Sequence, residues 1–291
     1  MSATYVKTGS RRRAAWLYLI LPTMFILVLF FIVPLLSLFW TSFHQYVPGK
    51  GITDTLTWGY YTKFLSDIYY IGILIKTILL GIGVTLATLL LGYPVAYFIA
   101  RTNSERKGFY FALIIFPLFL NIVVRSFAWI VILANRGLVN DLLIKLGLLA
   151  TPVKMLYNYF GVMVGMTHVF LPFMVLAVAT AIRNVDRSCE EAAMSLGANR
   201  ARTFWSVTLP LSMPGVLGGS LLVFLLSITA FVTPRLLGGV TVKVISNLIY
   251  QQFMFTGNWP FGAAIGFILL AFTLIIIVGY FRTFKMSESQ G

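Results

Sequence analysis

The sequence predicts an all-α integral membrane protein with six transmembrane helices. Of its 291 residues, 59% are hydrophobic and only 10% are charged, whereas about a quarter of the residues in a soluble domain are charged. Six apolar runs have the length of about 20 residues that a helix needs to cross the hydrocarbon core. The basic residues lie mostly in segments that flank these runs. Membrane topology therefore explains the net charge of +14 better than a nucleic-acid partner does.

The six spans follow one another along the chain, separated by polar connections. They are expected at Ala14–Phe43, Ile71–Ala100, Phe109–Ala134, Tyr157–Ile182, Gly215–Pro234 and Trp259–Phe281. Residues 14–281 then form one membrane domain, between an N-terminal tail at 1–13 and a C-terminal tail at 282–291. Short amphipathic helices are expected at Leu138–Leu149 and around Val244–Phe255. The first run is too long for the apolar part of a cleavable signal, so it is expected to be retained.

The distribution of basic residues predicts the orientation. An even number of spans places both tails on one side, together with the turn at 101–108 and the polar segment 183–210. These four segments hold 13 of the 22 lysines and arginines, whereas the three opposite connections hold 7. The excess predicts that both termini and the segment 183–210 are cytoplasmic.

The polar segment 183–210 is expected to fold as two short helices. Ser188 followed by Glu191 has the spacing of a capping box, which places a helix start near Ser188. Gly197 can end that helix in the left-handed conformation. Asn199 is expected to cap a second helix at Arg200–Val207, which Pro210 would stop.

This segment resembles the EAA loop of permeases from ATP-binding-cassette (ABC) importers. The match consists of Glu191-Ala192-Ala193, three residues, Gly197, nine residues and Val207-Thr208-Leu209-Pro210, with valine where isoleucine is usual. The resemblance implies the type I ABC importer permease fold and makes 183–210 the coupling loop, whose helix docks on an ATP-hydrolysing subunit. The docking residues it implies are Ser188, Glu190, Glu191, Ala192, Ala193, Ser195, Leu196, Gly197, Ala198, Arg200 and Phe204.

Further stretches resemble permeases of the spermidine/putrescine type. They are Leu91–Arg101, Asn121–Arg136, Leu171–Val175, Pro210–Val216 and Asn258–Ala264. This resemblance implies a bacterial inner-membrane subunit that works with a second membrane subunit, two ATPase subunits and a periplasmic binding protein. A different chain is expected as the second membrane subunit, although the sequence leaves open a second copy of this one. It also implies that ATP and Mg bind to the ATPase subunits, so that no cofactor belongs to this chain.

Polar residues in or beside the third to fifth spans are the candidates for the solute pathway. They are Asn121, Arg125, His168, Ser227, Thr233 and Arg235. A charge inside the bilayer is costly unless it faces a cavity or a partner, which makes Arg125 the most informative of them. Lys76, near the outer end of the second span, is instead expected to extend its charge to the interface. Arg235 stands beside a helix break expected from Pro234 and Gly238.

The charge of these candidates leaves the solute open. Polyamine permeases tend to carry an acidic residue just after the fifth span, where this chain has Arg235. Two arginines without an intramembrane acid favour an anionic or zwitterionic solute, such as an opine, an amino-acid-like compound or a phosphonate. The family resemblance favours a polyamine, which remains the first choice.

Other classes of protein fit the sequence less well. There is no G-x-x-x-x-G-K-[ST] motif, no cluster of nucleophile and base, and no metal-ligand cluster, so the chain is expected not to be an enzyme. A secondary transporter that needs no ATPase would require ion-coupling carboxylates in its spans, and none is visible.

Overall fold

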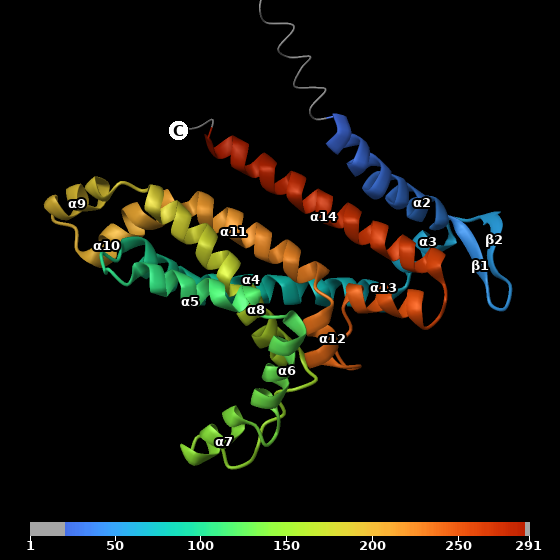
Figure 1. Ribbon diagram of the computed structural model, residues 1–291, viewed down its shortest axis with the longest axis horizontal. Helices are drawn as coiled ribbons and strands as arrows, with labels where there is room; N and C mark the ends of the chain where they lie inside the picture. Colours follow the sequence, from blue (N-terminus) through green and yellow to red (C-terminus); the bar gives the residue numbers. More distant parts are fainter. Residues whose placement is uncertain (1–20, 289–291) are drawn as a thin grey trace, which may run out of the picture. The chain divides into compact units, whose positions relative to one another are not determined.

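The computed structural model describes residues 21–288, and nearly all of them are helical (Figure 1). The predicted tail at 1–13 and the start of the first span lie outside the described residues. The described chain divides into two compact units, one made of residues 21–64 and 249–270 and the other of residues 65–248 and 271–288. The elements of the first part are η1 (Val28–Ile32), α2 (Val33–Thr41), β1 (His44–Val47), β2 (Gly51–Leu56), α3 (Gly59–Ser66), α4 (Ile68–Arg101), α5 (Lys107–Phe119), α6 (Ile122–Leu133) and α7 (Leu138–Lys145). Those of the second part are α8 (Tyr159–Asn184), α9 (Arg187–Ser195), α10 (Arg200–Thr203), η2 (Phe204–Thr208), α11 (Leu209–Thr229), α12 (Val232–Gly238), α13 (Ile245–Met254) and α14 (Trp259–Glu288).

The predicted number of six spans is confirmed, but some of the boundaries differ. The helical stretches of the described chain that are long and apolar enough to cross a membrane are Leu21–Thr41, Ile68–Arg101, Ile122–Lys145, Tyr159–Asn184, Arg200–Thr229 and Trp259–Arg282. The short helices predicted in two connections are present as α7 and α13. Helix α14 continues to Glu288, so the predicted polar tail at 282–291 begins as helix.

The predicted third span, Phe109–Ala134, is wrong as a single helix. Helix α5 ends at Phe119, and Leu120 is extended, with φ −81° and ψ 136°. Asn121 then caps α6 by accepting a hydrogen bond from the backbone N–H of Val123 at 2.8 Å. The extended Leu120 and the Asn121 cap therefore separate two helices inside a run that is apolar throughout.

The predicted fifth span, Gly215–Pro234, is wrong at both ends. At its start, Pro210 does not stop the helix, because the π-helical turn η2 leads directly into α11. A π turn shifts the carbonyl that the proline ring would otherwise contact, and the same arrangement of a π turn before a proline occurs at η1 and Pro34. At its end, the chain is extended at Ala230, and the Ala230 carbonyl accepts a hydrogen bond from the Ser246 hydroxyl. The break therefore precedes Pro234.

Helix α8 is the centre of the larger unit and packs against α4, α11, α5, α6 and α12. Its contact with α11 is closest at Gly215 and Gly219. A Cβ atom at Gly215 would lie 2.2 Å from Ala181 Cβ, and one at Gly219 would lie 3.0 Å from Ala177 Cβ. The Gly-x-x-x-Gly spacing thus allows two membrane helices to pack at short range.

The first connection contains a β-hairpin, which was not predicted from the sequence. Strands β1 and β2 are antiparallel, with Val47 opposite Gly51 and Tyr46 opposite Ile52. Gly49 and Gly51 have φ of +83° and +84°, values that glycine adopts without strain. The Pro48-Gly49 pair, followed by Gly51, is the sequence signal for this turn.

Candidate functional site

The N-cap of helix α9 lies two residues before the predicted N-cap, Ser188. Its N-cap is Asp186, whose carboxylate accepts a hydrogen bond from the backbone N–H of Ser188 at 3.0 Å. The predicted capping box of Ser188 and Glu191 is therefore wrong, because Ser188 already lies in the first turn. A carboxylate is a strong acceptor and is favoured at the positive end of the helix dipole. The hydrogen bonds from Ser188 hold the pKa of the Asp186 carboxyl below its ordinary value.

The turn after α9 has the predicted conformation. Gly197 has φ +91°, and its N–H donates to the carbonyl of Met194 at 3.0 Å. Asn199 then caps α10 by accepting a hydrogen bond from the backbone N–H of Arg202 at 2.8 Å. The second helix is longer than predicted, because α10 (Arg200–Thr203) continues through η2 into α11 and the helical stretch ends only at Thr229.

A polar brace attaches α9 to the end of α4. The Glu190 carboxylate lies 2.8 Å from the guanidinium of Arg101 and accepts a hydrogen bond from the Thr208 hydroxyl at 2.8 Å. Arg101 also donates to the carbonyl of Val185 at 3.1 Å, and its own carbonyl accepts a hydrogen bond from the Arg187 side chain. Three segments distant in sequence are thereby held together, namely α4, α9 and η2.

The predicted docking residues divide by exposure into two groups. The exposed group comprises Ser188, Glu191, Ala192, Ser195, Leu196, Gly197 and Arg200. The half-buried group comprises Glu190, Ala193, Ala198 and Phe204. Leu196 is 90% exposed, which is unusual for a leucine and leaves its side chain free for a contact outside this chain.

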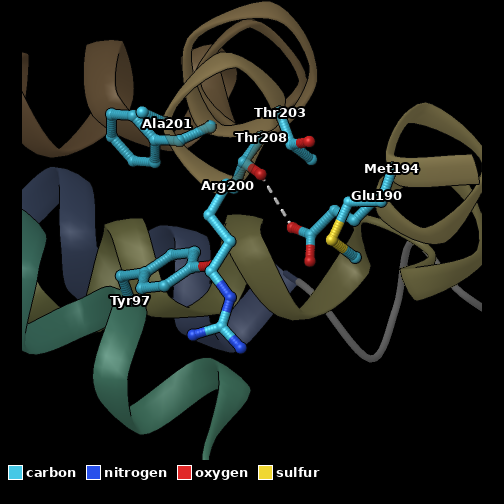
Figure 2. Close-up of a pocket in the computed structure, with 8 residues that line it drawn as sticks. Tyr97, Glu190, Met194, Arg200, Ala201, Thr203 and Thr208 are labelled. Atoms are coloured by element: carbon cyan, nitrogen blue, oxygen red, sulfur yellow. Dashed lines mark hydrogen bonds between the residues drawn. The ribbon is translucent and has the colours of Figure 1, made fainter. Parts of the chain in front are cut away.

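Two of the half-buried residues face a hollow of about 460 Å³ beside α9 (Figure 2). Phe204 lies edge-on to Tyr93 and Tyr97, with ring centroids 5.5 Å and 6.0 Å apart. Figure 2 shows the Glu190 carboxylate turned toward Thr208 at the wall of the hollow. Glu190 and Phe204 therefore hold the loop together, and the sequence motif alone did not separate this role from docking.

The structure brings three of the predicted pathway residues together, on α6, α8 and α12. Arg125 is only 9% exposed, and its Nε and one terminal nitrogen have no hydrogen-bond partner among the described residues. Ser126, which the sequence analysis missed, lies 3.4 Å from Thr233 through the two hydroxyl oxygens. His168 packs edge-on to Trp129, with ring centroids 5.6 Å apart. The arginine thus lies in a polar cluster to which α6, α8 and α12 contribute no Asp or Glu.

The remaining predicted pathway residues have other surroundings. Asn121 is exposed and its side chain caps α6. Ser227 is buried on α11, and its hydroxyl has no hydrogen-bond partner among the described residues. Arg235 is exposed within the short helix α12, which lies between the break at Ala230 and a second break after Gly238, where Gly239 has φ +58°. The break predicted at Gly238 is therefore present, whereas Pro234 lies inside α12.

Comparison with known proteins identifies the family. Residues 89–284 match the family described as "Binding-protein-dependent transport system inner membrane component". The chain belongs to this family. It is 32% identical over 264 residues to the spermidine/putrescine transport system permease protein PotB of Escherichia coli, which covers 91% of this chain and 96% of the relative. It is 30% identical over 257 residues to the inner membrane ABC transporter permease protein YdcU of the same species, covering 84% and 79%.

Solved structures share the fold. A bacterial ABC transporter that imports the acidic polysaccharide alginate aligns with a TM-score of 0.71 at 19% identity, covering 94% of this chain and 96% of the other. The alginate transporter in complex with its pentasaccharide-bound periplasmic protein aligns with a TM-score of 0.73 at 20% identity, covering 93% of each chain. The chain is thus an ABC importer permease subunit and not an enzyme, with the predicted type I fold.

Proposed function

We propose that this chain forms half of the membrane pathway of an ATP-driven importer and that the exposed face of α9 docks an ATP-hydrolysing subunit. The observation that carries the proposal is the exposure of Glu191 on α9 and of Leu196 at its C-cap, while Glu190 of the same helix is fixed by the brace to Arg101. A nine-residue helix is marginal by itself. Anchoring α9 to α4 gives it a fixed position and lets a force on α9 reach a membrane helix.

The proposed assembly contains a second membrane subunit, two ATPase subunits that bind ATP and Mg, and a periplasmic binding protein. The excess of basic residues in the tails and the coupling loop supports a cytoplasmic position for these segments. Closure of the ATPase subunits on ATP would then draw the coupling helices together and rotate the spans as rigid bodies between inward-open and outward-open states.

A polyamine is the proposed solute, because PotB, which is a spermidine/putrescine permease, resembles this chain over 91% of its length. The second candidate is an anionic or zwitterionic solute. It is favoured by the buried Arg125, since α6, α8 and α12 supply no carboxylate to it. For a polyamine, the carboxylates along the path would come from the second membrane subunit.

Reconstitution into liposomes tests the proposal. The chain is assembled with the ATPase subunits, second membrane subunit and binding protein encoded with it, and uptake of labelled spermidine and putrescine is measured with and without ATP. The proposal requires uptake that depends on ATP and on the ATPase subunits. Uptake that continues without the ATPase subunits would contradict the assignment as an ATP-driven importer and indicate a secondary transporter. ATP-dependent uptake of anionic solutes alone would overturn the polyamine assignment.

Arg125→Gln separates the two candidate solutes in the same liposomes. If the solute is anionic, the loss of this charge abolishes uptake while ATP hydrolysis continues. If the solute is a polyamine, the transporter with this variant keeps its selectivity for polyamines, because Arg125 then pairs with a carboxylate of the second membrane subunit. Ser126→Ala is the matched control, since it changes a neighbouring buried polar group without changing the charge.

A further inference from the structure

Two adjoining hollows lie on the larger unit at the end of α4 that is remote from the coupling loop. The first has a volume of about 370 Å³ and a polar lining that includes Tyr69, Lys76 and Lys243. The second has a volume of about 430 Å³ and is lined mainly by apolar side chains, among them Leu79, Phe160 and Met163. Lys76 and Tyr159 line both hollows, so that the two adjoin.

The polar hollow is positively charged. The Lys243 ammonium donates to the Tyr69 hydroxyl at 2.9 Å and lies 5.0 Å from the centre of the same ring, which fixes its position. An ammonium has three N–H donors, so Lys243 keeps donors for a ligand. Lys76 is exposed, and neither hollow has an Asp or Glu among its described lining residues.

The depth of Lys76 matches the level of lipid headgroups. Helix α4 has 34 residues and is about 51 Å long at about 1.5 Å per residue. It exceeds a hydrocarbon core of about 30 Å by roughly 10 Å at each end. Lys76 comes eight residues after the helix start at Ile68, which is about 12 Å along the axis. The polar hollow is then at the interface, and the apolar hollow, one turn further along α4, reaches into the hydrocarbon.

We propose that the two hollows form a binding site for one anionic phospholipid in the leaflet remote from the coupling loop. The headgroup phosphate contacts Lys76 and Lys243, and an acyl chain lies against Leu79, Phe160 and Met163. The pairing of charge with phosphate and of apolar surface with an acyl chain selects this ligand over a soluble anion, which would leave the apolar hollow empty. The proposal depends on the membrane fold and not on the identity of the solute.

Native mass spectrometry of the assembled transporter tests the site. The complex is purified with equal amounts of phosphatidylglycerol and phosphatidylcholine that carry the same acyl chains, and the lipids retained on this chain are counted. We expect phosphatidylglycerol to be retained preferentially. Each lysine strengthens anionic-lipid binding about fivefold, so Lys76→Gln with Lys243→Gln should lower the preference by roughly 25-fold. Lys154→Gln is the matched control, because Lys154 is exposed and lines neither hollow.

A second variant tests the apolar hollow. Leu79→Trp fills the hollow without changing its charge and should reduce retention of both lipids. The proposal is overturned if the double lysine variant keeps its preference for phosphatidylglycerol, or if Leu79→Trp retains as much lipid as the unmodified chain. It is also overturned if the isolated chain holds the lipid and the assembled transporter does not, since the face would then be a contact between subunits.

Discussion

Replacing Glu190 by glutamine should uncouple ATP hydrolysis from uptake. The substitution keeps the shape of the side chain and an oxygen that can accept from Thr208, but it removes the ion pair with Arg101. The two side chains are 12% and 13% exposed, so solvent screens the pair only weakly. A charged hydrogen bond in such surroundings contributes about 2 kcal/mol, which corresponds to roughly a 30-fold change in the population of the attached α9.

The assay compares solute uptake with ATP hydrolysis in liposomes that contain the complete transporter. Glu190→Gln should lower the amount of solute moved per ATP by about tenfold or more, while binding of the ATPase subunit changes little. Glu191→Gln is the matched control, because it makes the same chemical change one residue further on, at an exposed position. We expect that control to weaken binding of the ATPase subunit instead.

Arg101→Lys should have a milder effect than Glu190→Gln, because the ammonium keeps the charge and loses the second contact to Val185. The reasoning is refuted if Glu190→Gln transports as much solute per ATP as the unmodified chain. It is equally refuted if Glu190→Gln and Glu191→Gln weaken ATPase binding to the same extent, since the brace would then have no role separate from docking.

Three further predictions concern the loop and the helix packing. Gly197→Ala should weaken binding of the ATPase subunit, because φ at this residue is +91° and an alanine there costs about 1 kcal/mol of backbone free energy. The space around Gly197 is open, so the added methyl group causes no clash. An unchanged binding constant for the ATPase subunit would contradict this prediction. The pKa of the Asp186 carboxyl is lower in the folded chain than in the unfolded chain, so its stabilisation of α9 is present above the unfolded pKa and disappears as the pH falls through the folded pKa. Hydrogen exchange of the α9 amides should show this loss of stability. Asp186→Asn should remove the pH dependence. Gly215→Ala should destabilise the packing of α11 on α8 by about 1–3 kcal/mol, whereas Gly218→Ala, whose Cβ would meet nothing within 4 Å, should not lower the thermal midpoint.

Local signals in the sequence were sufficient for much of the coupling loop. Gly197 and Asn199 act through their own backbone and neighbouring amides, so residue type and spacing predicted their structure correctly. The start of α9 was misplaced because Asp186 and Ser188 are both good N-caps, and spacing to Glu191 favoured the wrong one. The inward position of Glu190 could not be predicted, since its partner Arg101 is 89 residues away in the chain.

The helix breaks were harder to predict than the spans. Hydropathy measures only the apolar character of a run, and the breaks after Phe119 and Thr229 lie inside apolar runs. Asn121, which caps α6 at the first break, was predicted only as a pathway residue. At the second break, the Ala230 carbonyl accepts a hydrogen bond from the Ser246 hydroxyl, a contact that is made only in the folded chain. The same limit applies to the cluster around Arg125, which three separate helices build.

The central claim, that α9 is the docking helix, is tested most directly at Cys189. This residue is the only cysteine of the chain and is exposed on α9. It shares a helix face with Ala192, three residues further on, and lies on the same helix that Leu196 caps at its C-terminal end. The rate of Cys189 labelling by a maleimide is measured on the chain in detergent, with and without the ATPase subunits. The account predicts strong protection when the ATPase subunits are bound, and equal labelling rates in a complex shown to be assembled would contradict it.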